Sequence, residues 1–311
     1  MPSLTSVKRA IRNLPILRRV FHDRNRLSSE CDQFNQALFV PPGHFYSPIP
    51  SVDEIKKDEA KIFETVTRCI AGIDLHEVEQ FNLLDQFVAY YDEMPFSSKK
   101  GGQLRYYFDN PAYSYSDAIL LYCMIRFLKP KRIVEVGSGF SSCVMLDTNE
   151  LFFNNTIQTT FIEPYPELLR SLVKQMDQMR IQMIPHRLQD VDLEIFRMLD
   201  ANDILFIDST HICKTNSDVN RVLFEILPHL VPGVHIHFHD IFWPFEYPKK
   251  WVYEGRAWNE VYMLRAFLQY NETFRVVLMN TFMEHFHAAF FREQMPLCLK
   301  DPGGSVWIRK G

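Results

Sequence analysis

The stretch Arg132-Ile-Val-Glu-Val-Gly-Ser-Gly-Phe-Ser-Ser-Cys143 decides the fold of this chain. An apolar run meets a short turn containing Gly137 and Gly139, and a helix-like segment follows. Buried parallel strands of α/β proteins end in this way, in a loop whose glycines let a ligand approach the backbone closely. Glu135 stands just before the first glycine, where it can face that ligand. The pattern predicts a cofactor that carries a nucleoside.

The composition is that of an ordinary globular protein. The 311 residues can form one large domain, or a domain with an extension. Apolar residues make up 47% and charged residues 23%, and a net charge of -4 gives no general reason to expect nucleic acid as a partner. Six scattered cysteines without a CxxC pair predict reduced thiols in a cytoplasmic protein. No apolar run approaches the ~20 residues that a transmembrane helix needs.

The beginning of the chain is basic. Residues 8–26 contain seven Lys and Arg residues against the single acid Asp23, and apolar residues recur among them at helical spacing. Arg18 and Arg19 interrupt the continuous apolar core that a signal peptide needs. Two interpretations follow: a basic amphipathic helix on a membrane surface or an acidic partner, or a solvated helix packed on its own protein. We favour the second.

The part of the chain before the glycine turn reads as mainly helical. A proline-rich segment at 40–52 must be extended or turned. Helices are predicted at 53–70, capped by Ser51 or Asp53, at 73–91 as one or two helices, and at 116–128. The polar, glycine-containing segment 97–102 is the best boundary candidate. We therefore expect a mostly helical extension or cap over residues 1–104 and a cofactor-binding domain over residues 105–311.

Strand and helix patterns alternate from residue 131 onward. Candidate strands are Arg132–Val136, Thr159–Glu163, Gln182–Pro185, Ile204–Asp208, Val234–His239, Phe274–Met279 and Ser305–Arg309. Helical patterns separate most of them, at 166–178, 193–199, 219–230 and 259–270. This alternation predicts an α/β fold with a doubly wound, seven-stranded sheet that is mostly parallel. The last two strands lack a long helix between them, so the last strand should run antiparallel.

Acids stand where the predicted strands end. In open α/β sheets, ligands bind at the carboxyl ends of the strands, near the switch in strand order. Strand two ends at Glu163, which follows Glu135 by 28 residues (163 minus 135) and can accept hydrogen bonds from ribose hydroxyls. Asp190 follows strand three, where a side chain can read an adenine amino group. An acid near a strand end is often only a helix cap, but together these residues favour a nucleoside cofactor.

Strands four and five end in the candidate reactive residues, Asp208 with His211 and His239 with Asp240. These strands should be neighbours, which would bring the four side chains together. One interpretation is a site for a divalent metal such as Mg²⁺, with Asp208, His239 and Asp240 as ligands, that lowers the pKa of a substrate hydroxyl. The other is metal-free, with His211 or His239 as general base and an aspartate that orients it. Both stay open.

Four further residues have a functional and a structural interpretation. His235 and His237 lie inside strand five, so we expect them to be buried and hydrogen-bonded rather than catalytic. Trp243 opens an aromatic, proline-rich loop that suits a lid or a substrate wall. Arg256 could bind an anionic group of the substrate, or could pair with Glu260 at i,i+4.

These motifs resemble the class I S-adenosylmethionine-dependent methyltransferases, and most closely small-molecule O-methyltransferases with Asp-x-x-His and His-Asp motifs. The resemblance spans residues 105–311 and rests on Glu135-Val-Gly-Ser-Gly, Glu163, Phe206-Ile-Asp-Ser-Thr-His211 and His239-Asp240. It implies a Rossmann-like sheet with S-adenosylmethionine as cofactor. The residues that it places beside the cofactor are Glu135, Gly137, Ser138, Gly139, Ser141, Glu163, Asp190 and Asp208.

The resemblance has two departures. Ser141 replaces the third glycine of the loop, which is tolerable because serine is small. His239 stands where metal-dependent relatives have an Asp or Asn ligand, which puts metal binding in question.

The leading hypothesis is a methyltransferase that acts on a hydroxyl of a small molecule, such as a sugar or a secondary metabolite. The helical extension would cover the site or form a homodimer contact. A nicotinamide-dependent oxidoreductase shares the glycine loop and the distal acid, although this loop lacks GxGxxG. A non-catalytic cofactor-binding module is the third hypothesis, which the retained acids and histidines argue against.

Overall fold

The computed structural model describes residues 38–311, so the predicted basic helix at 8–26 lies outside the described residues. The described chain forms two compact units, residues 38–64 with 252–257, and residues 65–251 with 258–311. The smaller unit contains α3 (Val52–Lys57) and α4 (Glu59–Phe63). Ser51 caps α3 as predicted, because its Oγ accepts a hydrogen bond from the backbone N–H of Glu54 at 3.4 Å.

The single helix predicted at 53–70 is wrong, since α4 ends at Phe63. The segment that follows, Thr65-Val-Thr67, is β-branched throughout, and such side chains lose rotamer freedom in a helix. Asp58 interrupts the helical run between α3 and α4, with a backbone φ of -102° and ψ of 14°.

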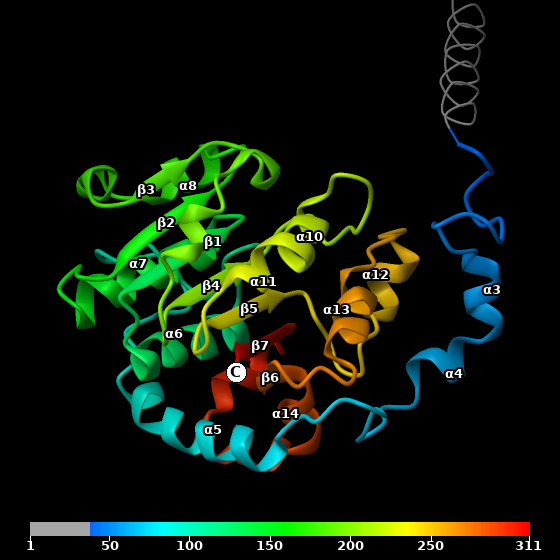
Figure 1. The fold of residues 1–311 in the computed structure, drawn as a ribbon. Coiled ribbons are helices and arrows are strands. Elements are labelled where there is room, and N and C mark those ends of the chain that lie inside the picture. The colour runs from blue at the N-terminus through cyan, green and yellow to red at the C-terminus, as the bar shows by residue number, and fades with distance from the viewer. Residues whose placement is uncertain (1–37) are drawn as a thin grey trace, which may run out of the picture. The chain divides into compact units, whose positions relative to one another are not determined.

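The larger unit is built on one seven-stranded sheet in the order β3-β2-β1-β4-β5-β7-β6 (Figure 1). Only β7 runs antiparallel to its two neighbours. The strands are β1 (Arg132–Val136), β2 (Gln158–Ile162), β3 (Gln182–Ile184), β4 (Ile204–Ile207), β5 (His235–His239), β6 (Phe274–Met279) and β7 (Ser305–Lys310). All seven predicted strands are confirmed to within a residue or two, as are the antiparallel last strand and the pairing of β4 with β5.

Helices connect the strands and follow the predicted alternation. The longer ones are α5 (Glu77–Asp92), α6 (Tyr115–Leu128), α7 (Phe140–Phe152) and α13 (Glu260–Leu268). The shorter elements are α8 (Glu167–Leu172), η1 (Gln175–Met179), η2 (Leu188–Asp190), α9 (Glu194–Arg197), α10 (Asp218–Arg221), η3 (Val222–Ile226, a π-helical turn), α11 (Leu227–His229), α12 (Lys249–Tyr253), α14 (Asn280–Phe286), α15 (Ala288–Gln294) and η4 (Pro296–Lys300). Nearly every residue of α6 is buried, so this helix forms part of the core.

The helix predicted at 166–178 ends early, because a buried ion-pair network holds its second half. Arg105 donates to Asp177 through Nε at 2.8 Å and Nη2 at 2.5 Å, and its Nη1 lies 2.6 Å from Asp147 of α7. Asp177 also accepts from the backbone of Lys174 at 2.6 Å. These bonds keep residues 175–179 as a separate 3₁₀ turn instead of a continuation of α8.

Residues 65–104 belong to the larger unit. Helix α5 packs on α6 and β6, and the Gln80 side chain accepts a hydrogen bond from the backbone of Met279 at 2.8 Å. The two compact units therefore meet in the sequence between Glu64 and Thr65. The predicted boundary between a helical extension and a cofactor-binding domain, at 104/105, stays a prediction. Within residues 38–311, no helix combines the length and apolar character that crossing a membrane requires.

Gly137 joins the end of β1 to the end of β4. Its φ of +80° lies in the left-handed region, and a Cβ at this position would stand 1.7 Å from the carbonyl oxygen of Asp208. Two backbone hydrogen bonds fix this close approach. Asp208 N–H donates to the Val136 carbonyl at 2.9 Å, and Gly137 N–H donates to the Ile162 carbonyl at 3.0 Å. Only glycine fits both the conformation and the space.

We expect Gly137→Ala to destabilise the protein more than Gly102→Ala, which provides a matched control. Gly102 also has a positive φ, +66°, but a Cβ there would meet nothing within 4 Å. Both changes cost about 1–2 kcal/mol for the left-handed backbone. Gly137→Ala should lose roughly a further 1–3 kcal/mol through overpacking. Denaturant unfolding measures both, and equal losses would contradict the close approach at Asp208.

Candidate active site

A cavity of about 370 Å³ opens at the carboxyl ends of β1, β2 and β4. Its walls include Gly137, Glu163, Leu188, Gln189 and Asp208. This is the place where the strand order reverses, because β1 lies between β2 and β4, and open α/β sheets bind their ligands at that point. A larger cavity of about 550 Å³ lies beside the edge strand β6 and contains none of the predicted site residues.

Glu163 offers an acid to this cavity and is fixed by the backbone. Its Oε1 accepts from Tyr165 N–H at 2.8 Å, and its Oε2 accepts from Ser138 N–H at 3.2 Å. The second bond ties the end of β2 to the glycine loop after β1. A half-buried carboxylate beside a glycine-lined wall fits a nucleoside whose ribose hydroxyls donate to the acid.

Glu135 is not among the residues that line the cavity, and it anchors the glycine loop instead. The carboxylate is fully buried and accepts hydrogen bonds from the hydroxyls of Ser141 and Ser142, in the first turn of α7. Ser142 also accepts from Gly139 N–H at 3.1 Å. Burial raises the pKa of Glu135 to about 8, although both serine hydroxyls oppose the rise. With both oxygens engaged, Glu135 supports the loop, and direct contact with the cofactor stays a prediction.

Asp190 lies outside the residues that line the cavity. Its carboxylate pairs with Arg187, 2.9 Å from Nε and 3.1 Å from Nη2, and both side chains are exposed. The neighbouring Leu188 and Gln189 do line the cavity, and Gln189 Nε2 donates to the carbonyl of Asn216 at 2.9 Å. Leu188 and Gln189, and not Asp190, therefore form the wall of this cavity, and a contact between Asp190 and the cofactor stays a prediction.

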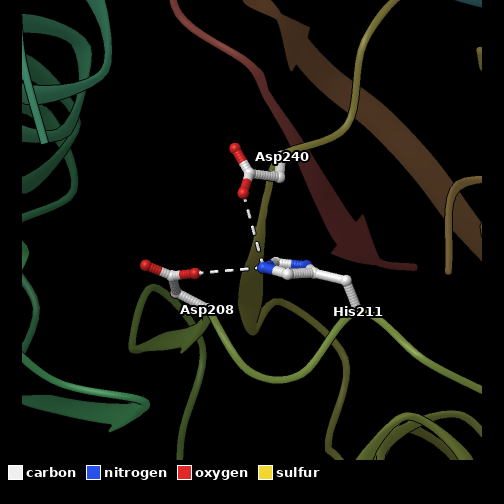
Figure 2. Close-up of side chains that lie close together, drawn as sticks. All are labelled: Asp208, His211 and Asp240. Atoms are coloured by element: carbon white, nitrogen blue, oxygen red, sulfur yellow. Dashed lines mark ion pairs between the residues drawn. The ribbon is translucent and has the colours of Figure 1, made fainter. Parts of the chain in front are cut away.

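Three of the four predicted reactive residues converge around one nitrogen atom (Figure 2). His211 Nε2 lies 3.4 Å from Asp208 Oδ1 and 3.4 Å from Asp240 Oδ2. One possible ligand atom from each residue lies within 4.8 Å of the others, as in a site for a metal ion. The structure thus groups His211, rather than His239, with the two aspartates.

His239 lies against this cluster but is turned into the core. Its Nε2 is 3.5 Å from Asp240 Oδ1, its ring centroid is 5.2 Å from that of Tyr113, and it is 7% exposed. Nδ1 has no hydrogen-bond partner among the described residues. Burial lowers the pKa of His239, but the charges of Asp208, Asp240 and Asp117 outweigh it and raise the pKa overall.

The charges of the cluster favour a proton on His211. Burial alone would lower the pKa of His211, but its bonds to Asp208 and Glu260 and the charge of Asp240 raise it to about 10. Burial would raise the pKa of Asp208, whereas the charge of His239 and the bond with His211 lower it. The pKa of Asp240 is raised because its burial outweighs both histidines. Without a bound cation, His211 is therefore protonated at neutral pH.

His235 and His237 are buried, as expected for residues within β5. The expected hydrogen bonds of His237 are absent, because neither ring nitrogen has a partner among the described residues. Its ring instead stacks on Phe206, with centroids 4.0 Å apart, and meets Trp307 edge-on at 4.8 Å. Burial lowers the pKa of His237 well below its usual value, so this side chain is a neutral core residue.

The two predicted substrate residues have other contacts. Trp243 is buried, packs on Phe245 and Phe282, and donates through Nε1 to the Thr67 carbonyl at 2.7 Å. Arg256 belongs to the smaller unit, where its Nη2 lies 3.1 Å from Glu254. The carboxylate considered as its partner, that of Glu260, binds His211 instead. A substrate role for Trp243 or Arg256 stays a prediction.

Sequence reasoning missed three residues beside the cluster. Glu260 Oε2 lies 2.8 Å from His211 Nδ1, the Trp258 ring lies 4.5 Å from the imidazole, and Tyr113 packs on His239. Trp258 and Glu260 follow His211 by almost fifty residues, so spacing could not reveal them. The one available signal was an acid at the start of a helix, which is usually a cap.

Comparison with known proteins assigns the middle of the chain to a known kind of domain. Residues 134–241 match a family model described as a methyltransferase domain. An uncharacterised protein of Archaeoglobus fulgidus is 39% identical over 169 residues, which cover 53% of this chain and 75% of that protein. The match with the family model assigns residues 134–241 to a methyltransferase domain, and the seven-stranded, Rossmann-like sheet with its cavity contains these residues.

Solved structures with a similar outline are more distant. The S-adenosylhomocysteine-bound methyltransferase PaMTH1 of Podospora anserina is 14% identical, with a TM-score of 0.42 over 84% of this chain and 96% of that one. The O-methyltransferase TomG of Streptomyces achromogenes, in complex with S-adenosylmethionine, is 14% identical, with a TM-score of 0.40 over 83% and 96%.

The buried position of Glu135 predicts a pH-dependent stability that Glu135→Gln should reduce. The folded-state pKa, about 8, lies above the ordinary value of 4.5, so this stabilisation is full below pH 4.5 and is lost as the pH rises through 8. The free energy of unfolding should therefore fall between pH 6 and pH 9 in the wild type, and fall less in Glu135→Gln. The exposed Glu167→Gln is the control, and identical slopes in all three proteins would refute the assignment.

Proposed function

We propose that this protein transfers the methyl group of S-adenosylmethionine to a hydroxyl of a small molecule. The observation that carries the proposal is the double position of Asp208. It lines the cofactor cavity and also lies 3.4 Å from His211 in the reactive cluster. A methyl group presented from the cavity would therefore meet an acceptor held by Asp208, His211 and Asp240.

The chemistry asks little of the protein beyond placement and proton removal. The sulfonium of S-adenosylmethionine is already a strong electrophile, so catalysis consists mainly of aligning the acceptor oxygen and taking its proton. His211 holds a proton at neutral pH in the cation-free cluster, which makes it a donor rather than a base. The raised pKa of Asp240 suits this carboxylate for the base role.

A divalent cation fits the same cluster. Asp208, His211 and Asp240 supply two carboxylate oxygens and one imidazole nitrogen, and carboxylates alone would favour Mg²⁺. Carboxylates also suit Mn²⁺, and the imidazole donor raises the affinity for later transition metals such as Co²⁺ and Zn²⁺. A cation bound there would lower the pKa of the acceptor hydroxyl. In this proposal His211 takes the ligand position that sequence reasoning gave to His239.

The wall beyond the cluster supports a small, partly aromatic acceptor. Trp258 lies over His211 and meets Trp251 and Tyr247 edge-on, with centroids 5.5 and 5.9 Å away. Aromatic walls with a few convergent polar groups are usual for small-molecule sites. A cytoplasmic location and a homodimer remain predictions from the sequence.

S-adenosylhomocysteine should bind the protein, and Glu163→Gln should weaken that binding. The lost charge-assisted hydrogen bonds are worth about 1.5–3 kcal/mol, or roughly 10–100-fold in Kd. Isothermal calorimetry measures the effect, with the exposed Glu167→Gln as control and NADH as the competing cofactor class. No heat with S-adenosylhomocysteine, or binding of NADH in its place, would overturn the proposal.

Co²⁺ or Mn²⁺ should bind the wild-type protein with one ion per chain, and Asp240→Asn should weaken this binding by at least about tenfold, because a charged ligand is lost. The absorption spectrum of the Co²⁺ complex measures the stoichiometry and the affinity for Co²⁺ in the wild type and in Asp240→Asn. Asp190→Asn is the control, because Asp190 forms an exposed ion pair with Arg187. A wild-type protein that binds neither ion would leave Asp240 as the base and remove the cation from the proposal.

A further inference from the structure

We infer that Glu260 is a positioning residue, which holds the His211 ring with Nδ1–H toward itself and Nε2 toward the gap between Asp208 and Asp240. Its catalytic meaning rests on the proposed function, but the arrangement itself can be tested without substrate, cofactor or metal. Glu260 is outside the set of residues that line the cofactor cavity.

The contact between the two side chains fixes where the ring proton sits. Glu260 Oε2 lies 2.8 Å from His211 Nδ1, and the two residues are 1% and 4% exposed. Burial raises the pKa of Glu260, but the ring lies among three carboxylates, since Nε2 is 3.4 Å from both Asp208 and Asp240, so the proton of this bond belongs to Nδ1 and Glu260 accepts it. Nε2 is then the nitrogen that faces Asp208 and Asp240, whether it carries a proton or binds a cation.

The backbone on either side locks the same arrangement. His211 has a φ of +58°, and its carbonyl accepts from both Asn259 N–H and Glu260 N–H at 3.1 Å. The Asn259 side chain accepts from Cys213 N–H at 2.6 Å and donates to the Cys213 carbonyl at 3.2 Å. The start of α13 is therefore bound directly to the loop after β4.

Two further groups hold the loop and the ring. Thr210 donates through its backbone N–H at 3.0 Å and its hydroxyl at 2.6 Å to Asp218 at the start of α10. The Trp258 ring lies 4.5 Å from the imidazole and 38° from parallel to it. Together with Glu260, these contacts leave the imidazole one orientation, which is what preorganisation of a reactive group requires.

Stability alone does not explain why Glu260 and His211 form a buried ion pair. Burying a carboxylate is costly, and well-packed apolar residues often stabilise a core as much or more. The second carboxylate oxygen of Glu260, Oε1, has no hydrogen-bond partner among the described residues. The bond to His211 is therefore the one side-chain hydrogen bond that this carboxylate makes there. The pair also points the opposite ring nitrogen at two functional aspartates, which stability alone does not require.

The test is the nitrogen and proton spectrum of histidine-labelled protein, with the His211 signals assigned by His211→Asn. In the wild type, the Nδ1–H of His211 should give a downfield resonance, because its partner is charged. Glu260→Gln should abolish or strongly shift that resonance, since a glutamine amide can also donate to an unprotonated Nδ1. Glu225→Gln, which alters an exposed pair with Arg221, should leave it unchanged.

An unshifted His211 Nδ1–H resonance in folded Glu260→Gln would overturn the inference. If that variant fails to fold, Glu260→Asp replaces it, because it keeps the charge but withdraws the carboxylate by one methylene. The resonance should then move, and an unmoved one would again overturn the inference. Calorimetry with S-adenosylhomocysteine runs in parallel: no binding by the wild type contradicts the proposed function, whereas this inference stands or falls on the histidine spectrum.

Discussion

The close approach of Gly137 to the Asp208 carbonyl is the constraint on which the site depends. It joins the ends of β1 and β4 so tightly that a Cβ would stand 1.7 Å from that oxygen. The glycine loop and the aspartate loop are consequently held together, and Asp208 belongs both to the cavity wall and to the cluster with His211 and Asp240. Glu163 links the end of β2 to the glycine loop through its bond to Ser138. Placement of a methyl donor within tenths of an ångström needs such a scaffold.

The sequence predicts the strands well because the features that mark a strand are local. A buried parallel strand is an apolar run, its end is marked by Gly137 or an acid, and both features lie within a few residues. Helices are predicted less well where distant side chains decide their ends, as Arg105 does by holding Asp177 away from α8. Local patterns do not record such contacts between segments far apart in the chain.

In the site, too, local features were predictable and contacts between distant segments were not. Asp208, His211, His239 and Asp240 were predicted to converge, because they stand at or just after the ends of neighbouring strands, which share an edge of the sheet. Which histidine joins the aspartates was not predictable, since it depends on the left-handed backbone of His211 and on Glu260 far along the chain. His239 occupies the expected position in the sequence, but its buried ring packs on Tyr113 and, of the two aspartates, approaches only Asp240, at 3.5 Å.

The partners of each acid's two oxygens distinguish the roles of the buried and half-buried carboxylates. Both oxygens of Glu135 accept serine hydroxyls, so this acid holds a loop. Glu163 binds two backbone N–H groups but remains half-buried at the cavity wall, where ligand hydroxyls can reach its remaining lone pairs. Glu260 commits one oxygen to His211 and leaves the other unpaired, so its effect passes to the cluster through the imidazole. An acid near a strand end or a helix start thus acquires its role from what already occupies its oxygens, a property of the folded chain and not of its position in the sequence.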